Sequence, residues 1–211
     1  MEMKVAFGFK PHSGWAVLVA IAAGRSGRVE LIDRRRIALV DDGEGSWAKQ
    51  PYHAAQRAQR DEPGARDEAE RLVARGVESA RRLAIREVRD AARRIAASGH
   101  EVAAGAVLMS DPLPDWSVDE ILAVHVRMHK AEGVLFREAL ARAVSRCGLR
   151  LVQLSDRKLQ AEAAAALGAG VAQALSQIDR LRQSCGAPWG QDQKDAALAA
   201  WIALRRAAKS A

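Results

Sequence analysis

Short apolar runs separated by turn residues dominate the first forty residues and predict three strands. Turn-forming residues stand between the runs, at Pro11 to Gly14 and in a Gly-Arg-Ser-Gly segment at 24–27. Successive strands with such short connections form an antiparallel meander. The predicted strands cover residues 3–9, 15–22 and 29–40.

After residue 40 the pattern changes to a polar segment and then to alternating helices and strands. Residues 41–64 carry several glycines and prolines and predict a loop, with at most a short helix near 53–60. Apolar residues at helical spacing predict a long helix over 65–98. The uniformly apolar segment 102–109 is typical of a strand that is buried on both faces.

Helices and one more strand are expected in the remaining half of the chain. Ser117 and Glu120 form a capping box, which predicts a helix from 117 to 146. A strand is expected over 149–154, and the order of elements indicates an α/β protein. The later helices are expected over 156–166, 170–184 and 191–208.

Composition limits the class of protein. The chain has 211 residues, 49% of them hydrophobic, which is enough for a core and predicts a single α/β domain over 1–211. Its two cysteines match no metal motif and no disulfide framework, so a reducing, cytoplasmic location is expected. No apolar run approaches the roughly 20 residues of a membrane-spanning helix, so no membrane partner is expected.

The charge of the chain permits a nucleic-acid partner. Lys and Arg outnumber Asp and Glu by 33 to 26, a net charge of +7. Along the helix at 65–98 arginines and acids alternate, which is typical of a solvated face. Strand alternation places Arg34 and Arg36 on one face and Arg35 on the other, so at least one is expected to be exposed. The candidate phosphate contacts are Lys10, His12, Ser13, Arg34 and Arg36, although Lys10 could also be an ordinary solvated turn residue.

His125 and His129 are a second candidate site. They stand four residues apart on one predicted helix, a spacing that can chelate a transition metal. No third ligand is obvious in the neighbouring sequence, although Asp119, Glu120 and Glu132 are candidates. A histidine pair without a metal is therefore expected.

Four segments form an ordered series along the chain. They are Gly-Phe-Lys-Pro-His-Ser-Gly-Trp-Ala-Val at 8–17, Lys-Ala-Glu-Gly-Val at 130–134, the strand and its exit at 149–158, and Asp-Gln-Lys-Asp-Ala-Ala-Leu-Ala at 192–199. In this order they resemble RuvC-type Holliday-junction resolvases of the ribonuclease H-like superfamily. The resemblance implies a five-stranded mixed sheet that begins with three antiparallel strands, with helices on both faces and extra C-terminal helices.

The resemblance also implies a chemistry and a departure from it. These resolvases hold two divalent cations, usually Mg²⁺, with acids of the first strand, the fourth strand and the last helix. Asp192 and Asp195 match the last-helix pair, as metal ligands and catalytic groups, and Asp111 is the nearest fourth-strand acid. The first-strand position is Lys10, whose ammonium would repel a cation and pair with Asp192 or Asp195.

Three functions are therefore open. The first is a RuvC-like nucleic-acid-associated protein with a degenerate acid set that lacks full two-metal nuclease activity. The second is a junction- or structure-selective nuclease that uses Mg²⁺ or Mn²⁺ with Asp111, Asp192 and Asp195. The third is a protein-interaction scaffold, and the Ala-rich helices after residue 156 make a homodimer plausible. Asp192 and Asp195 also fit a simpler interpretation, because acids are common in the first turn of a helix.

Overall fold

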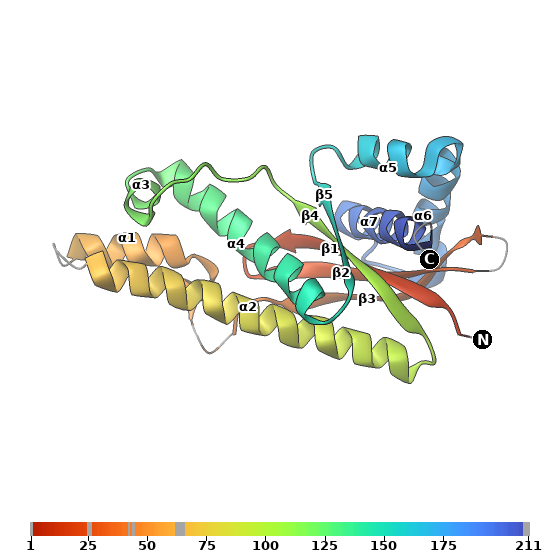
Figure 1. Cartoon of the computed structure of the whole chain (residues 1–211), viewed down its shortest axis with the longest axis horizontal. Helices are drawn as coiled ribbons and strands as arrows, with labels where there is room; N and C mark the ends of the chain where they lie inside the picture. The colour runs from red at the N-terminus through yellow and green to blue at the C-terminus, as the bar shows by residue number, and fades with distance from the viewer. Residues whose placement is uncertain (1, 25–26, 42, 44, 62–65, 209–211) are drawn as a thin grey trace.

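A mixed sheet organises the molecule (Figure 1). The computed structural model describes residues 2–24, 27–41, 43, 45–61 and 66–208. Within these residues the strands are ordered β3-β2-β1-β4-β5. Their bounds are β1 (Lys4–His12), β2 (Trp15–Ala23), β3 (Val29–Ala38), β4 (Glu101–Met109) and β5 (Arg150–Ser155).

Strand direction decides which chain segments meet. The pairs β1–β2 and β2–β3 are antiparallel, whereas β1–β4 and β4–β5 are parallel. The C-terminal ends of β1, β4 and β5 therefore lie at one edge of the sheet. The start of β2 and the end of β3 lie at the same edge, since Trp15 pairs with both His12 and Ala38.

Two long helices cover one face of the sheet. α2 (Arg66–Ala97) and α4 (His125–Arg146) pack there over a core that includes Phe7, Phe9 and Phe136. α2 extends along most of the length of the molecule, and α1 (Pro51–Asp61) and α3 (Val118–Leu122) lie near its N-terminal end (Figure 1). The short 3-10 helix η3 (Ser46–Lys49) precedes α1.

The opposite face is covered by α7 (Gln191–Ala208), and α5 (Leu159–Leu167) and α6 (Val171–Cys185) pack against α7. The 3-10 helix η4 (Gly168–Gly170) connects α5 to α6. Gly8 lets α7 approach β1, because a Cβ at this position would lie 1.9 Å from the carbonyl oxygen of Ala196. The run from Ala196 to Leu204 is buried throughout. The alanines of α7 are thus used inside the chain, and the homodimer suggested for the Ala-rich helices after residue 156 stays a prediction.

The observed elements confirm the predicted fold and correct two details. The helix predicted over 117–146 is divided into α3 and α4, because Val124 has extended backbone angles (φ −134°, ψ 114°) that cannot continue a helix. The predicted loop at 41–64 contains η3 and α1, and Pro51 begins α1, a position that proline favours. Residues 42, 44 and 62–64 of that predicted loop lie outside the described residues.

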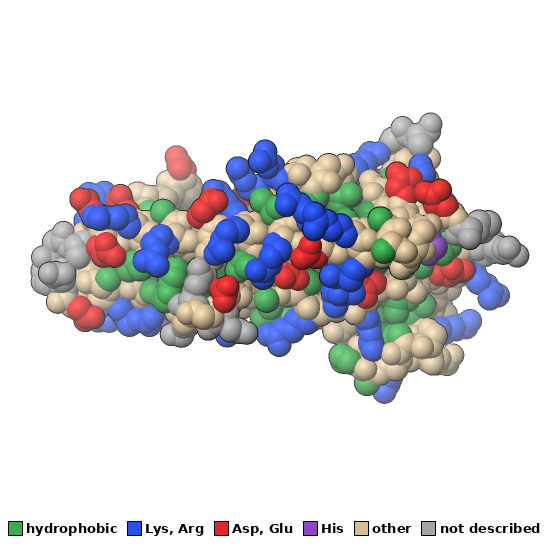
Figure 2. Space-filling view, turned by 90° about the horizontal axis from the view of Figure 1, so that it is seen from below, with side chains coloured by type: hydrophobic (Ala, Val, Ile, Leu, Met, Phe, Trp, Pro, Cys, Tyr) green, Lys and Arg blue, Asp and Glu red, His purple; other side chains and the backbone are tan. Residues whose placement is uncertain are grey.

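The exposed face of α2 is solvated and mixed in charge. Figure 2 shows basic side chains interleaved with acidic ones along the face that is seen from below. Ion pairs three residues apart account for part of this pattern, and they join Arg71 to Glu68, Arg81 to Glu78 and Arg93 to Asp90. Among the described residues, no helix has the length and apolar character needed to cross a membrane.

Candidate functional site

The strand ends bring most of the sequence candidates to one edge of the sheet. Lys10 and His12 lie at the end of β1, and Asp156 directly follows β5. The first turns of α7 carry Asp192 and Asp195 to the same place, where they contact the β1 side chains. Carboxyl ends of parallel strands are the usual location of sites in α/β proteins.

Lys10 is the centre of an ion cluster that also contains Asp156, Asp195 and Arg137, which we call the Lys10 cluster. The Lys10 Nζ lies 2.5 Å from Oδ1 of Asp156 and 3.2 Å from Oδ2 of Asp195. Nη2 of Arg137 lies 3.5 Å from the other oxygen of Asp156. The four side chains are only 14–22% exposed. The pairing of Lys10 with Asp195 is one of the two that the sequence suggested.

The surroundings keep Lys10 charged. Burial lowers the pKa of the Lys10 ammonium, but hydrogen bonds and negative charge from Asp156, and then from Asp195, outweigh burial and raise the pKa above its ordinary value of 10.5. The ammonium is therefore protonated at neutral pH. Two cationic and two anionic side chains then cancel within the Lys10 cluster.

His12, Trp15 and Arg36 form a stacked layer beside the cluster. The His12 and Trp15 rings are nearly parallel, with centroids 4.2 Å apart. The Arg36 guanidinium carbon lies 4.2 Å from the centroid of the Trp15 ring, a cation–π contact. His12 also binds Asp192, with 2.9 Å between Nε2 and Oδ2. Because β2 lies between β1 and β3, Trp15 is flanked by a side chain from each neighbouring strand.

Two predicted site residues have other partners. Arg34 donates hydrogen bonds to the backbone carbonyls of residues 185–188, at 2.9 Å to Cys185 and 3.0 Å to Ala187. The Arg34 guanidinium thus contacts the turn after α6, and its prediction as a phosphate contact is not carried into the proposal below. Asp111 is 67% exposed and pairs with Arg157 at 3.0 Å, and neither residue belongs to the Lys10 cluster.

A cavity of about 450 Å³ adjoins the cluster through Arg137. Lys130 and Arg157 also line the cavity, together with Trp116, and Asp111 supplies an acid. Arg137 is paired with Asp156 and Arg157 with Asp111, so Lys130 supplies the remaining positive charge among these lining residues. This positive charge favours an anionic group.

Sequence reasoning missed Asp156 and Arg137 as members of the site. Asp156 could have been identified from the sequence, because it is the first acid after β5, and the C-terminal end of β5 lies at the same edge of the sheet as those of β4 and β1. Arg137 could not have been identified in this way, because its place in the sequence of α4 does not indicate that it contacts Asp156.

Comparisons with known proteins support the fold. No protein-family model and no curated protein matches the sequence. Among solved structures, RuvC of T. thermophilus in complex with a Holliday junction substrate matches with a TM-score of 0.50 and 12% identity, over 98% of this chain and 96% of that chain. A second structure of Thermus thermophilus RuvC gives a TM-score of 0.49 at the same identity and coverage. The similarity concerns the fold alone: the chain has the ribonuclease H-like fold of RuvC, as its motifs predicted.

Proposed function

We propose that this chain is a RuvC-like nucleic-acid-binding protein in which an internal ion cluster replaces the two-cation centre. The observation that carries the proposal is the Lys10 ammonium between Asp156 and Asp195, at the strand ends where related folds gather acids. The fold favours a nucleic-acid partner, although fold alone does not fix function.

The cluster does not fit a pair of magnesium ions. Mg²⁺ needs oxygen ligands in near-octahedral geometry and is held by carboxylates. Here the carboxylate oxygens of Asp156 and Asp195 already contact an ammonium at 2.5 and 3.2 Å. Asp192 is bound to His12, and Asp111 to Arg157. The residues at this position therefore do not fit metal-dependent cleavage.

Two neighbouring surfaces supply the proposed contacts to phosphates. One is the cavity with Lys130, Arg137 and Arg157. The other is the exposed Arg36 with Ser13 in the β1–β2 turn. Strands lie about 4.8 Å apart, so the five strand ends span about 19 Å, a width that a nucleic-acid duplex can cover.

The first test measures binding. Fluorescence anisotropy of labelled four-way-junction and duplex DNA should show binding to the full chain that weakens steeply as salt increases. Arg36→Gln and Arg157→Gln should each weaken binding and reduce the salt slope by about 1. Arg93→Gln is the matched control, because Arg93 is an exposed arginine on the distant face of α2. No binding at low salt would remove the proposal and favour the scaffold function.

The second test measures cleavage. Incubation of junction DNA with Mg²⁺ or Mn²⁺ should give no metal-dependent product. A product that disappears in Asp195→Asn would instead establish the nuclease alternative with Asp111, Asp192 and Asp195.

A further inference from the structure

Three histidines converge where α1 meets α4, away from the Lys10 cluster. His125 and His129 lie one turn apart on α4, and His53 lies in the first turn of α1. One ring nitrogen from each lies within 4.8 Å of the others. The ring centroids are 4.5–5.1 Å apart. Three of the five histidines of the chain are thus gathered at one point.

Glu132 fixes the orientation of the His53 ring. Its Oε1 accepts hydrogen bonds from the His53 backbone N–H at 3.3 Å and from Nδ1 at 2.8 Å. Since an ionised carboxylate can only accept, Nδ1 carries the proton and Nε2 presents its lone pair in the neutral ring. Nε2 of His53 is buried and has no hydrogen-bond partner among the described residues. A buried polar atom of this kind calls for a partner, and the other two imidazoles are its neighbours.

We propose that His53, His125 and His129 bind a divalent first-row transition metal ion, with Zn²⁺ as the best match. Imidazole nitrogens suit Zn²⁺, and three histidines are a known ligand set that leaves one position open. Zn–N bonds of about 2.0–2.1 Å place tetrahedral ligand atoms about 3.3 Å apart. The exposed side chains of His125 and His129 can close the remaining distance by rotation.

The contact of Glu132 with His53 supports a metal site at these histidines. A ligating histidine commonly donates its other N–H to a carboxylate, which fixes the tautomer and raises the basicity of the ligand. Glu132 is only 2% exposed, so its negative charge is costly unless a cation is near. A metal ion on the far side of the His53 ring supplies that cation.

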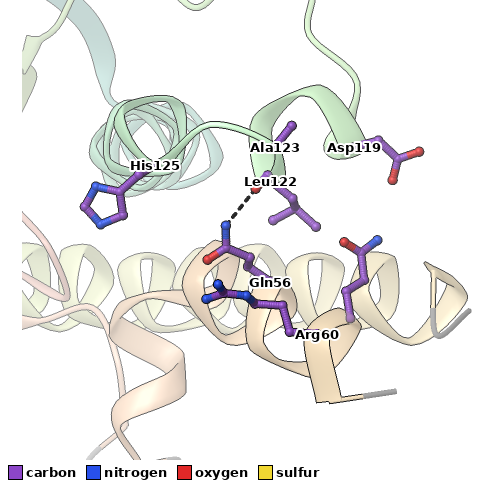
Figure 3. A pocket seen from close by; sticks show the side chains of 7 residues that line it. Gln56, Arg60, Asp119, Leu122, Ala123 and His125 are labelled. Carbon is purple, nitrogen blue, oxygen red and sulfur yellow. Dashed lines mark hydrogen bonds between the residues drawn. The ribbon is translucent and has the colours of Figure 1, made fainter. Parts of the chain in front are cut away.

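His125 also lines a groove between α1 and the α3–α4 junction (Figure 3), which offers a route to the proposed metal. The groove has a volume of about 680 Å³ and is lined by His125, Gln56, Arg60 and Asp119, among others. Gln56 donates a hydrogen bond to the Leu122 carbonyl oxygen at 2.9 Å and thereby joins its two walls. Water or a small anion can reach the metal by this route.

The site is separate from the Lys10 cluster. His129 and Arg137 are eight residues apart on α4, which corresponds to about 12 Å along the helix axis. His129 also lines the cavity with Lys130 and Arg157, so His53 and His125, which do not line it, are the variants that report on the metal site alone. The metal proposal does not depend on the proposed function.

Metal titration of the full, chelator-treated chain tests the proposal. Competition with a chromophoric zinc chelator should give one Zn²⁺ per chain, and Co²⁺ should give the visible absorption of a four-coordinate ion with nitrogen ligands. His53→Ala and His129→Ala should each abolish stoichiometric binding, and Glu132→Gln should weaken it 10–100-fold. His100→Ala, which removes a histidine outside the cluster, and Asp195→Asn should bind as the unmodified chain does.

Two results would overturn the assignment. One is the absence of saturable binding by the unmodified chain. The other is binding that survives in both His125→Ala and His129→Ala. These two positions are exposed, so their variants are expected to fold, which circular dichroism can verify.

Discussion

Replacing Lys10 with methionine tests whether the ion cluster stabilises the fold. The change keeps a side chain of similar length and removes the ammonium that contacts Asp156 and Asp195. Asp156 then keeps Arg137 at 3.5 Å, whereas Asp195 keeps, among the described residues, only the hydrogen bond from Gln191 at 2.7 Å.

The distances set the size of the effect. At an effective dielectric constant of about 20, contacts at 2.5 and 3.2 Å correspond to roughly 7 and 5 kcal/mol of attraction before desolvation is subtracted. Loss of one partner of a fully buried pair costs about 3–5 kcal/mol. Because these side chains keep some exposure and Arg137 remains, we expect the free energy of unfolding to fall by about 2–3 kcal/mol.

The effect should depend on pH with a definite sign. The pKa of Lys10 is raised above 10.5, so its stabilisation is fully present below that value. It is lost as the pH rises through the raised pKa. The difference between the unmodified chain and Lys10→Met should therefore stay constant across neutral pH and shrink in strongly alkaline solution.

Urea denaturation followed by circular dichroism measures this difference. Lys4→Met is the matched control, because Lys4 lies on the same strand but is exposed, and its loss should change stability by less than about 0.5 kcal/mol. Equal stabilities for the two variants at neutral pH would refute the structural role of the cluster.

Four further substitutions test individual contacts of the fold. Gly8→Ala should lower the free energy of unfolding by about 3 kcal/mol or prevent folding, because its Cβ would lie 1.9 Å from the Ala196 carbonyl oxygen. Gly133→Ala has ordinary space on α4 and should raise the free energy of unfolding by about 0.5–1 kcal/mol. Thermal melting compares the two variants. Arg34→Met should cost about 1–3 kcal/mol in urea denaturation because four carbonyls lose a charged donor, and an unchanged midpoint would contradict this role. Asp111→Asn removes only an exposed ion pair, so its midpoint should move by less than about 1 kcal/mol, and a larger loss would show a structural role that the geometry does not indicate.

The fold could be predicted because local patterns and topology agree. The buried strand at 102–109 and the helix at 191–208 are recognisable from their apolar residues alone, and β4 and α7 follow them closely. The division between α3 and α4 was not predictable, because the capping box marks where a helix starts and no glycine or proline marks the break at Val124. α1 was underestimated since its sequence is short and polar.

Only those residues of the candidate site that belong to local sequence motifs could be predicted. Lys10 and Asp195 were identified through motifs of the strand and the last helix. Asp156 and Arg137 join them through tertiary packing, which no local pattern encodes. His53 was missed for the same reason, because His125 and His129 are distant from it in sequence. Whether the three histidines bind a metal stays a prediction.

The position of α7 between the sheet and the outer helices has a kinetic consequence. Its central residues are buried against β1, β2 and β4 on one side and against α5 and α6 on the other. Their amide hydrogens are therefore expected to exchange slowly, because exchange requires these layers to open. The aspartates at the start of this helix stand directly before that protected segment, so the contacts around residue 10 are anchored on one side by one of the most deeply buried helices of the fold.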